Sequence, residues 1–130
     1  MMVLNTSAQR TLLLVDDDPL LTELFGEILG ELYAIKTADS VVAAQHVIER
    51  DRIDMVISDY HLGLQDGDDL LAWILLTKPT LAEHFILLTG DDSANLNALK
   101  GMVTVLYKPV QIAVLLDTIE QMFQPDKEVS

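Results

Sequence analysis

The sequence predicts an α/β domain built on a doubly wound sheet of five parallel strands. Short apolar runs alternate with segments of helical periodicity along the chain, which is typical of strands and helices that alternate around a parallel sheet. The runs are continuously apolar, as expected for strands buried on both faces. The length of 130 residues suits one domain, and the sequence has neither an internal repeat nor a low-complexity linker.

The first half of the chain contains three predicted strands and two predicted helices. The strands are expected at residues 12–15, 33–37 and 55–57. Asp18 is a candidate N-cap for the first helix, with Pro19 in its first turn, and Ser40 can cap the second. Apolar residues with helical spacing are Leu20, Leu21, Leu24, Phe25, Ile28, Leu29 and Leu32 in the first helix and Val41, Val42, Ala44, Val47 and Ile48 in the second. We expect the leucine-rich stripes to lie in the core.

The second half continues the alternation. After a loop with Gly63 and Gly67, a helix is predicted that carries Leu70, Leu71, Trp73, Ile74 and Leu75 and is closed by Lys78-Pro79. Strands at residues 85–88 and 103–107 flank a short helix within residues 91–100, and Trp73 is expected in the core. The last helix has a stripe of Ile112, Leu115, Leu116, Ile119, Met122 and Phe123. We therefore expect a folded domain over residues 11–123, with a flexible tail at 1–10 and a polar tail at 124–130.

Charge and composition bear on compartment and partners. Asp and Glu number 21 against 8 Lys and Arg, so the formal net charge of -13 disfavours unaided binding to nucleic acid or to an anionic membrane. Cysteine is absent, which excludes disulfides, thiolate metal sites and a cysteine nucleophile and suits a cytoplasmic protein. No apolar run approaches the roughly 20 residues of a membrane span, and the first residues do not resemble a signal peptide.

Polar side chains follow the predicted strands where the strands end. They are Asp16, Asp17 and Asp18 after the first strand, Asp59 after the third, Thr89 after the fourth and Lys108 after the fifth. Right-handed crossovers bring these loops to one edge of the sheet. Carboxylates that converge there repel one another by about 4 kcal/mol per close pair unless protons or a hard cation neutralise them. Oxygen ligands without Cys or His favour Mg²⁺ or a similar ion such as Mn²⁺.

Four short motifs at these strand ends resemble those of the receiver domains of two-component response regulators. They are Leu-Val-Asp-Asp-Asp at 14–18, Ile-Ser-Asp-Tyr-His-Leu at 57–62 with Asp66-Gly67 after it, Leu-Leu-Thr-Gly at 87–90 and Leu-Tyr-Lys-Pro at 106–109. Each motif is weak alone, but the four in this order are specific, and the match spans nearly all of the predicted domain. The resemblance implies the flavodoxin-like receiver fold with strand order 2-1-3-4-5.

The resemblance also implies roles for individual residues. It makes Asp59 the acceptor of a phosphoryl group. Asp16 and Asp17 match the acidic pair that binds Mg²⁺, and Asp59 and the backbone carbonyl of His61 would be further ligands. Thr89 matches the hydroxyl that turns toward the phosphoryl group.

Lys108 matches the invariant lysine of the family, and its peptide bond to Pro109 is expected to be cis. These roles agree with the chemistry, because phosphoryl transfer spreads charge over oxygens that a metal ion and a lysine can offset. Asp59 needs no activating base, since its carboxylate is already the nucleophile.

The implied function is acceptance of a phosphoryl group from a sensor histidine kinase, a histidine phosphotransfer protein or a small phosphodonor. Modification would switch contacts with a downstream protein target or an output domain. The domain would catalyse only its own modification and slow dephosphorylation, so it is not expected to be a conventional enzyme. We expect a monomer or a phosphorylation-dependent dimer that binds neither nucleic acid nor membrane directly.

Several positions depart from the family pattern. Gly63 stands where many receivers have Pro, and Gly90 stands where the family usually has Ala, so both loops should be more mobile. Val105 occupies the position of the family's switch aromatic, whereas Tyr107, two residues later, lies on the same face by strand alternation. The fourth helix is expected to be abbreviated.

Two other functions stay open. A phosphatase or phosphotransferase with an aspartyl-phosphate intermediate usually has a second carboxylate two residues after its nucleophile, where this chain has His61. A module that binds partners without phosphorylation is compatible with the altered region around Val105. For single residues the alternative is a structural role, such as a solvated cap for Asp16 and Asp17 or a surface position for Lys108.

Overall fold

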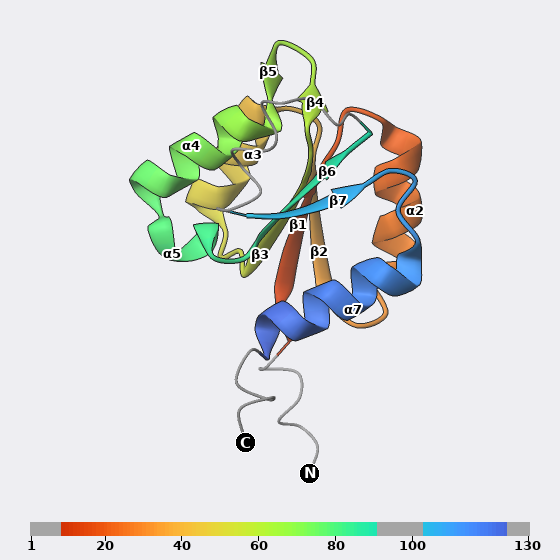
Figure 1. The fold of residues 1–130 in the computed structure, drawn as a ribbon. Coiled ribbons are helices and arrows are strands. Elements are labelled where there is room, and N and C mark those ends of the chain that lie inside the picture. The colour runs from red at the N-terminus through yellow and green to blue at the C-terminus, as the bar shows by residue number, and fades with distance from the viewer. Residues whose placement is uncertain (1–8, 91–102, 125–130) are drawn as a thin grey trace.

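The structure is a computed structural model that describes residues 9–90 and 103–124. The short helix predicted within residues 91–100 and most of the two predicted tails lie outside the described residues. Figure 1 shows a central sheet with helices on both faces, which confirms the predicted fold class. In the part of the chain that the structure describes, no helix is long and apolar enough to cross a membrane.

Five parallel strands form the sheet. They are β1 (Thr11–Val15), β2 (Ala34–Ala38), β3 (Met55–Asp59), β6 (Phe85–Thr89) and β7 (Thr104–Tyr107). Their order is β2-β1-β3-β6-β7, which confirms the predicted order because β6 and β7 are the fourth and fifth strands of this sheet. The register pairs Val15 with Ser58 and Asp59 with Leu88, so β1, β3 and β6 end at the same edge.

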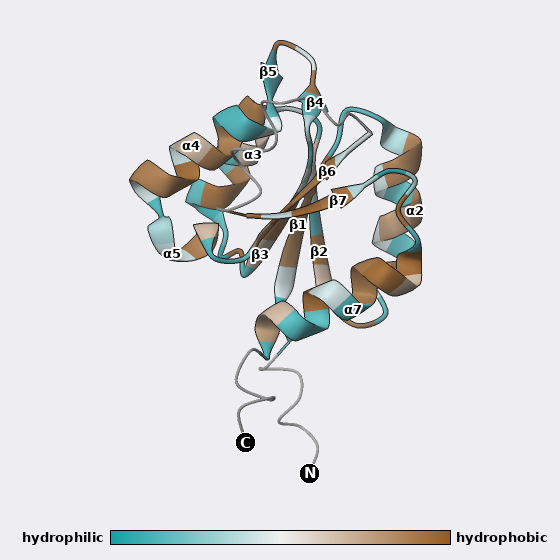
Figure 2. Ribbon diagram, in the orientation of Figure 1, coloured by the Kyte–Doolittle hydropathy of each residue, from teal (hydrophilic) through white to brown (hydrophobic). Residues whose placement is uncertain are grey.

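Helices α2 (Pro19–Leu29) and α7 (Ile112–Phe123) cover one face of the sheet in Figure 1. Helices α3 (Val41–Arg50), α4 (Gly67–Thr77) and the short α5 (Pro79–Ala82) cover the other face. The strands divide their apolar side chains between two core layers by simple alternation, so that Leu12 packs with α2 and α7, and Leu13 packs with α3 and α4. In Figure 2 the central strands are largely brown, the colour of hydrophobic residues. Trp73 packs against the α3 and α4 layer, as predicted.

The predicted helix starts are confirmed by their hydrogen bonds. The Asp18 side chain accepts from the Leu20 N–H at 3.0 Å, and the Ser40 hydroxyl accepts from the Ala43 N–H at 3.1 Å. Pro19 is the first residue of α2. Helix α4 ends at Thr77, before the predicted Lys78-Pro79 stop. Local capping chemistry therefore sets where these helices begin and end.

The expected burial of the whole leucine-rich stripe of α2 is wrong. Leu20 is 74% exposed, and Leu24 and Ile28 are exposed with it, one turn apart on the same side of the helix. A helix that lies on a sheet buries one stripe, and Phe25 and Leu29 occupy that stripe here. The helix ends at Leu29, so the predicted Leu32 lies beyond it and is also exposed.

The predicted loop after β3 contains a small hairpin. Its strands are β4 (His61–Leu62) and β5 (Gln65–Asp66), joined through Gly63, whose φ is 90°. Two-residue strands are too short to produce a visible alternation in the sequence. Gly67, predicted in the loop, is the first residue of α4, and Thr89, predicted to follow its strand, is the last residue of β6.

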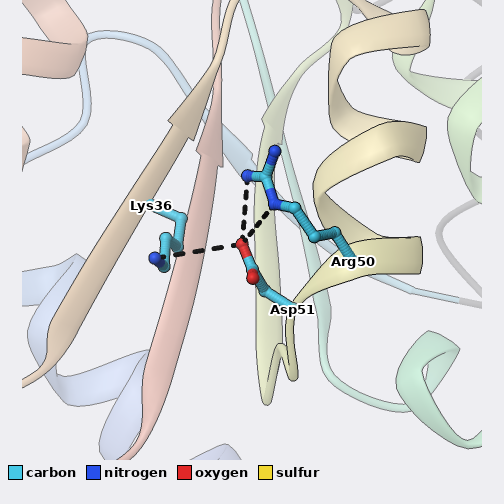
Figure 3. Close-up of polar contacts among 3 residues, drawn as sticks. All are labelled: Lys36, Arg50 and Asp51. Carbon is cyan, nitrogen blue, oxygen red and sulfur yellow. Dashed lines mark hydrogen bonds and ion pairs between the residues drawn. The ribbon is translucent and has the colours of Figure 1, made fainter.

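Ion pairs join α3 to β2 away from the carboxyl edge of the sheet. Figure 3 shows Asp51, which lies 3.1 Å from the Arg50 guanidinium and 3.8 Å from the Lys36 ammonium. The hydrogen bond from Arg50 lowers the pKa of Asp51, and the Lys36 charge adds to that effect. Because these side chains are largely solvated, the ion pairs contribute little to stability.

Candidate functional site

The four strand-end positions singled out in the sequence lie at one edge of the sheet. Asp59 and Thr89 are the last residues of β3 and β6, and Asp16 and Lys108 directly follow β1 and β7. The pairing of Asp59 with Leu88 and of Thr89 with Tyr107 places these ends side by side. Ligand sites in open parallel sheets form at this edge, where the strand order reverses.

Three carboxylates meet at this edge. Asp16, Asp17 and Asp59 each offer an oxygen that lies within 4.8 Å of the other two. Asp16 and Asp59 are only 8% and 7% exposed, whereas Asp17 is exposed. We call these three residues the acidic trio. Their convergence, expected from the strand ends, is confirmed.

The surroundings of Asp16 raise its pKa. Burial raises the pKa of Asp16, the hydrogen bond from the Asp18 N–H at 2.9 Å opposes this, and the Asp59 carboxylate raises it further. Oxygen donors alone, with more negative charge than one neighbouring lysine offsets, fit a hard divalent cation better than a zinc or copper ion. The donor set of the trio therefore fits Mg²⁺ or Mn²⁺.

Lys108 supplies a positive charge to the trio. Its Nζ lies 2.8 Å from Asp59 Oδ1, a charge-assisted hydrogen bond at the buried end of β3. The Lys108 N–H also donates to the Thr89 carbonyl at 2.8 Å, which holds the lysine backbone beside β6. The Lys108-Pro109 bond is cis, as the resemblance implied.

Thr89 is fully buried at the end of β6. Its partner in the β6 to β7 pairing is Tyr107, whereas Val105 pairs with Leu87 two residues further from the edge. Val105 packs against the α3 and α4 layer of the core. The aromatic residue next to Thr89 in the sheet is thus Tyr107.

His61 begins the hairpin that follows the trio. Its ring is exposed, stacks edge-on against Tyr60 at 4.9 Å and lies 3.9 Å from an Asp66 oxygen. The side chain therefore faces the hairpin, which agrees with assigning only the backbone carbonyl of His61 to a metal.

Two residues that the sequence analysis did not assign to the site contact the main-chain carbonyl of Asp59. Ser58 is fully buried, and its hydroxyl donates to the Asp59 carbonyl at 2.9 Å. Gly67 packs its backbone against the same carbonyl. A hydroxyl directly after the apolar run at residues 55–57 was the available signal for Ser58, and for Gly67 the signal was its place in the Asp66-Gly67 pair of the second motif.

A second acidic group lies at the start of α4. Asp66, Asp68 and Asp69 also bring carboxylate oxygens within 4.8 Å of one another. Asp66 and Asp69 form a capping box, in which the Asp66 N–H donates to Asp69 Oδ2 at 2.9 Å. Helix capping and the helix dipole account for this group.

Comparisons with known proteins identify the family of the chain. The family model described as "Response regulator receiver domain" matches residues 12–120. The chain is 36% identical over 113 residues to the transcriptional regulatory protein GlrR of Escherichia coli (strain K12), covering 84% of this chain and 25% of GlrR. It is 35% identical over 112 residues to the sensor histidine kinase RcsC of Salmonella typhimurium, covering 83% of this chain and 12% of RcsC.

Solved structures agree as well. The signal receiver domain of an HD domain-containing protein from Pseudomonas fluorescens Pf-5 superposes with a TM-score of 0.82 at 29% identity, covering 90% of this chain and 96% of that one. The chain spans a quarter or less of the two curated relatives named above. The fold, the four strand-end motifs and these matches together show that the chain belongs to the response regulator receiver domain family of two-component signalling.

Proposed function

We propose that this receiver domain accepts a phosphoryl group on Asp59 in a Mg²⁺-dependent step. The donor would be a phosphohistidine on a sensor kinase or a phosphotransfer protein, or a small phosphodonor. The observation that carries the proposal is the setting of Asp59, whose carboxylate lies within 4.8 Å of two other carboxylates and 2.8 Å from Lys108. A nucleophile, a cation site and a fixed positive charge are the parts that phosphoryl transfer requires.

Asp16, Asp17 and Asp59 would hold Mg²⁺ or Mn²⁺, with the backbone carbonyl of His61 as a further ligand. When bound, the ion would neutralise the trio and offset the charge of the phosphoryl oxygens. The exposed Asp17 borders solvent, as the entry of a hydrated ion requires.

The proposed step uses the Asp59 carboxylate directly. An Asp59 oxygen forms a bond to phosphorus while the phosphorus–nitrogen bond of the donor breaks, and the electron pair leaves with the imidazole nitrogen. No proton has to be removed from Asp59, since an ionised carboxylate is already a nucleophile. The Lys108 ammonium, now paired with Asp59, would remain beside the charge that spreads over the phosphoryl oxygens. The Thr89 hydroxyl would donate to one of those oxygens.

Phosphorylation would replace a carboxylate by a group with a charge near −2. The added charge beside Lys108 and Thr89 would favour one conformation of the domain over another, which is what a two-state switch needs. The output would be altered contact with a protein target or a linked domain. Slow loss of the phosphoryl group to water would reset the switch.

The test is incubation with acetyl phosphate and Mg²⁺ followed by intact mass measurement. We expect one phosphoryl adduct in the wild type and none in Asp59→Asn or in the presence of EDTA. Asp54→Asn is a matched control at the other end of β3, because an amide oxygen can still accept the 2.8 Å bond from the Thr11 N–H. It should form the adduct normally.

Other outcomes separate the alternatives. An adduct that survives in Asp59→Asn would contradict the assigned acceptor. No adduct in the wild type would favour a module that acts without phosphorylation. Release of many phosphate molecules per protein from a phosphoester would favour a phosphatase.

A further inference from the structure

The first turn of α4 lies unusually close to the backbone of Asp59. Gly67, the first residue of this helix, is buried. A Cβ atom built on Gly67 would lie 2.7 Å from the Asp59 carbonyl oxygen and 2.7 Å from Leu87 Cδ1. The Ser58 hydroxyl oxygen would lie 3.3 Å away. Real Cβ atoms do not approach other atoms to 2.7 Å, so any side chain at position 67 would force a displacement.

Space, and not backbone conformation, makes glycine necessary here. Among the described residues the only positive φ belongs to Gly63, at 90°, and no atom lies within 4 Å of a Cβ built there. At Gly67 the reverse holds. Its backbone dihedral angles are accessible to any residue, but the neighbouring atoms leave no space for a side chain. The Asp59 carbonyl belongs to the main chain, so it cannot rotate away from an added side chain as another side chain could. The close approach therefore excludes a side chain at position 67.

Hydrogen bonds connect the Gly67 contact to the site. The Gly67 N–H donates to the Tyr60 carbonyl at 2.6 Å, and the Tyr60 N–H donates to the Leu88 carbonyl of β6 at 2.8 Å. The Ser58 hydroxyl donates to the Asp59 carbonyl at 2.9 Å. The Asp59–Tyr60 peptide group is therefore held by β6 and by Ser58, and the Tyr60–His61 peptide group that follows it is held by the start of α4.

We propose that Gly67 is a positioning residue for the phosphoryl acceptor. By carrying no side chain, it lets α4 lie against the Asp59 carbonyl, and this contact sets where the Asp59 carboxylate stands relative to Lys108, Asp16 and Asp17. Through its hydrogen bond to the Tyr60 carbonyl, it also orients the peptide that leads into His61, the proposed carbonyl ligand. The inference rests on the proposed function of Asp59.

Gly67→Ala tests this role. The added methyl group must push α4 outward or rotate the Asp59 peptide, which would spread the oxygens of the acidic trio. We expect Mg²⁺ affinity, measured by titration calorimetry, to fall about tenfold or more, as is usual when a residue that supports metal ligands is lost. The rate of adduct formation with acetyl phosphate at saturating Mg²⁺ should fall by up to about a hundredfold, because a misplacement of about 1 Å has effects of that size.

A metal-free readout accompanies these measurements. Amide hydrogen exchange without Mg²⁺ should speed up at Tyr60 and at residue 67, whose N–H groups hold this contact. Gly30→Ala is the matched control, since its Cβ would lie 2.6 Å from the Gly26 carbonyl oxygen at the opposite end of α2 from the trio. It should leave Mg²⁺ affinity, adduct rate and exchange at Tyr60 unchanged.

Leu87→Val in the Gly67→Ala background separates positioning from packing. Valine has no Cδ1, so it removes the clash with Leu87 but keeps the clash with the Asp59 carbonyl. We expect this double variant to recover only part of the lost thermal stability, because the clash with the Asp59 carbonyl remains, while Mg²⁺ affinity and adduct rate stay low. It also serves as the test if Gly67→Ala alone does not fold.

Two results would overturn the inference. One is Mg²⁺ affinity and adduct rate within twofold of the wild type in Gly67→Ala. The other is recovery of both by Leu87→Val, which would trace the defect to core packing. A wild type that neither binds Mg²⁺ nor forms an adduct would instead overturn the proposed function itself.

Discussion

Neutralising Asp16 should stabilise the metal-free protein. Asp16→Asn removes one charge from the acidic trio while keeping an oxygen that can accept the 2.9 Å hydrogen bond from the Asp18 N–H. The wild-type carboxylate is 8% exposed and faces Asp59. Its removal therefore relieves both repulsion and the unfavourable burial of a charge.

The size of the effect follows from the geometry. Two carboxylates no more than 4.8 Å apart repel by at least about 3 kcal/mol at an effective dielectric constant of about 20. Lys108, 2.8 Å from Asp59, offsets part of this, which leaves about 1–2 kcal/mol to be gained. In a domain of 130 residues that gain corresponds to a rise of about 4–8 °C in Tm.

Thermal unfolding in EDTA at pH 7.5, followed by circular dichroism, measures this gain. Asp18→Asn is the control, because it removes a neighbouring charge that lies outside the trio and asparagine caps a helix as well as aspartate does. Its Tm should change by less than about 2 °C. With Mg²⁺ at about 100 times its Kd, the free energy of unfolding of the wild type should rise by about 2.7 kcal/mol. The difference in Tm between the wild type and Asp16→Asn should then disappear.

The pH dependence has a definite sign. Since the pKa of Asp16 is raised in the folded protein, its contribution to stability is full below the unfolded pKa and is lost as pH rises through the folded pKa. The advantage of Asp16→Asn should therefore be smaller at pH 5 than at pH 7.5. A variant that melts at or below the wild-type Tm in EDTA would refute the proposed repulsion.

Other variants test separate parts of the structure. Lys108→Met should lower Tm in EDTA by about 4 °C or more, because it leaves Asp59 without its ion pair, and should tighten Mg²⁺ binding in calorimetry by removing a competing positive charge. Leu24→Ser should shift Tm by less than about 2 °C, since Leu24 is exposed, whereas Leu29→Ala should cost about 2–5 kcal/mol, since Leu29 is buried. Ser40→Ala should cost about 1 kcal/mol in urea unfolding by removing the cap of α3.

The strands and the helix starts could be predicted because their signals are local. A continuous apolar run such as residues 12–15 indicates a buried strand, and Asp18 and Ser40 act on N–H groups two and three residues away. The burial of α2 could not be predicted in the same way. Two adjacent rows of its helix are apolar, and only the docking of the helix on the sheet decides that Leu29 is buried and Leu20 exposed.

The site likewise contains features that the sequence predicts and features that depend on tertiary packing. Parallel strands end at one edge, so Asp16, Asp59 and Lys108 could be brought together from sequence alone. The 2.8 Å pair between Asp59 and Lys108 depends on the register of β3, β6 and β7, which no local pattern specifies. The role of Gly67 depends on how closely α4 approaches β3, a tertiary property that the Asp66-Gly67 dipeptide does not reveal.

The charge of the site predicts that its carboxylates oppose the stability of the metal-free protein. Three carboxylates and one lysine leave a net charge of −2 within a few ångströms, in a chain that already carries -13. A divalent cation would cancel this charge, whereas a monovalent ion would leave half of it. Proposed phosphorylation of Asp59 would then add a further negative charge, which the site could hold only with both the cation and Lys108 present. A site suited to that state is necessarily strained without the cation, so the metal-free protein should be less stable than its neutralised variants.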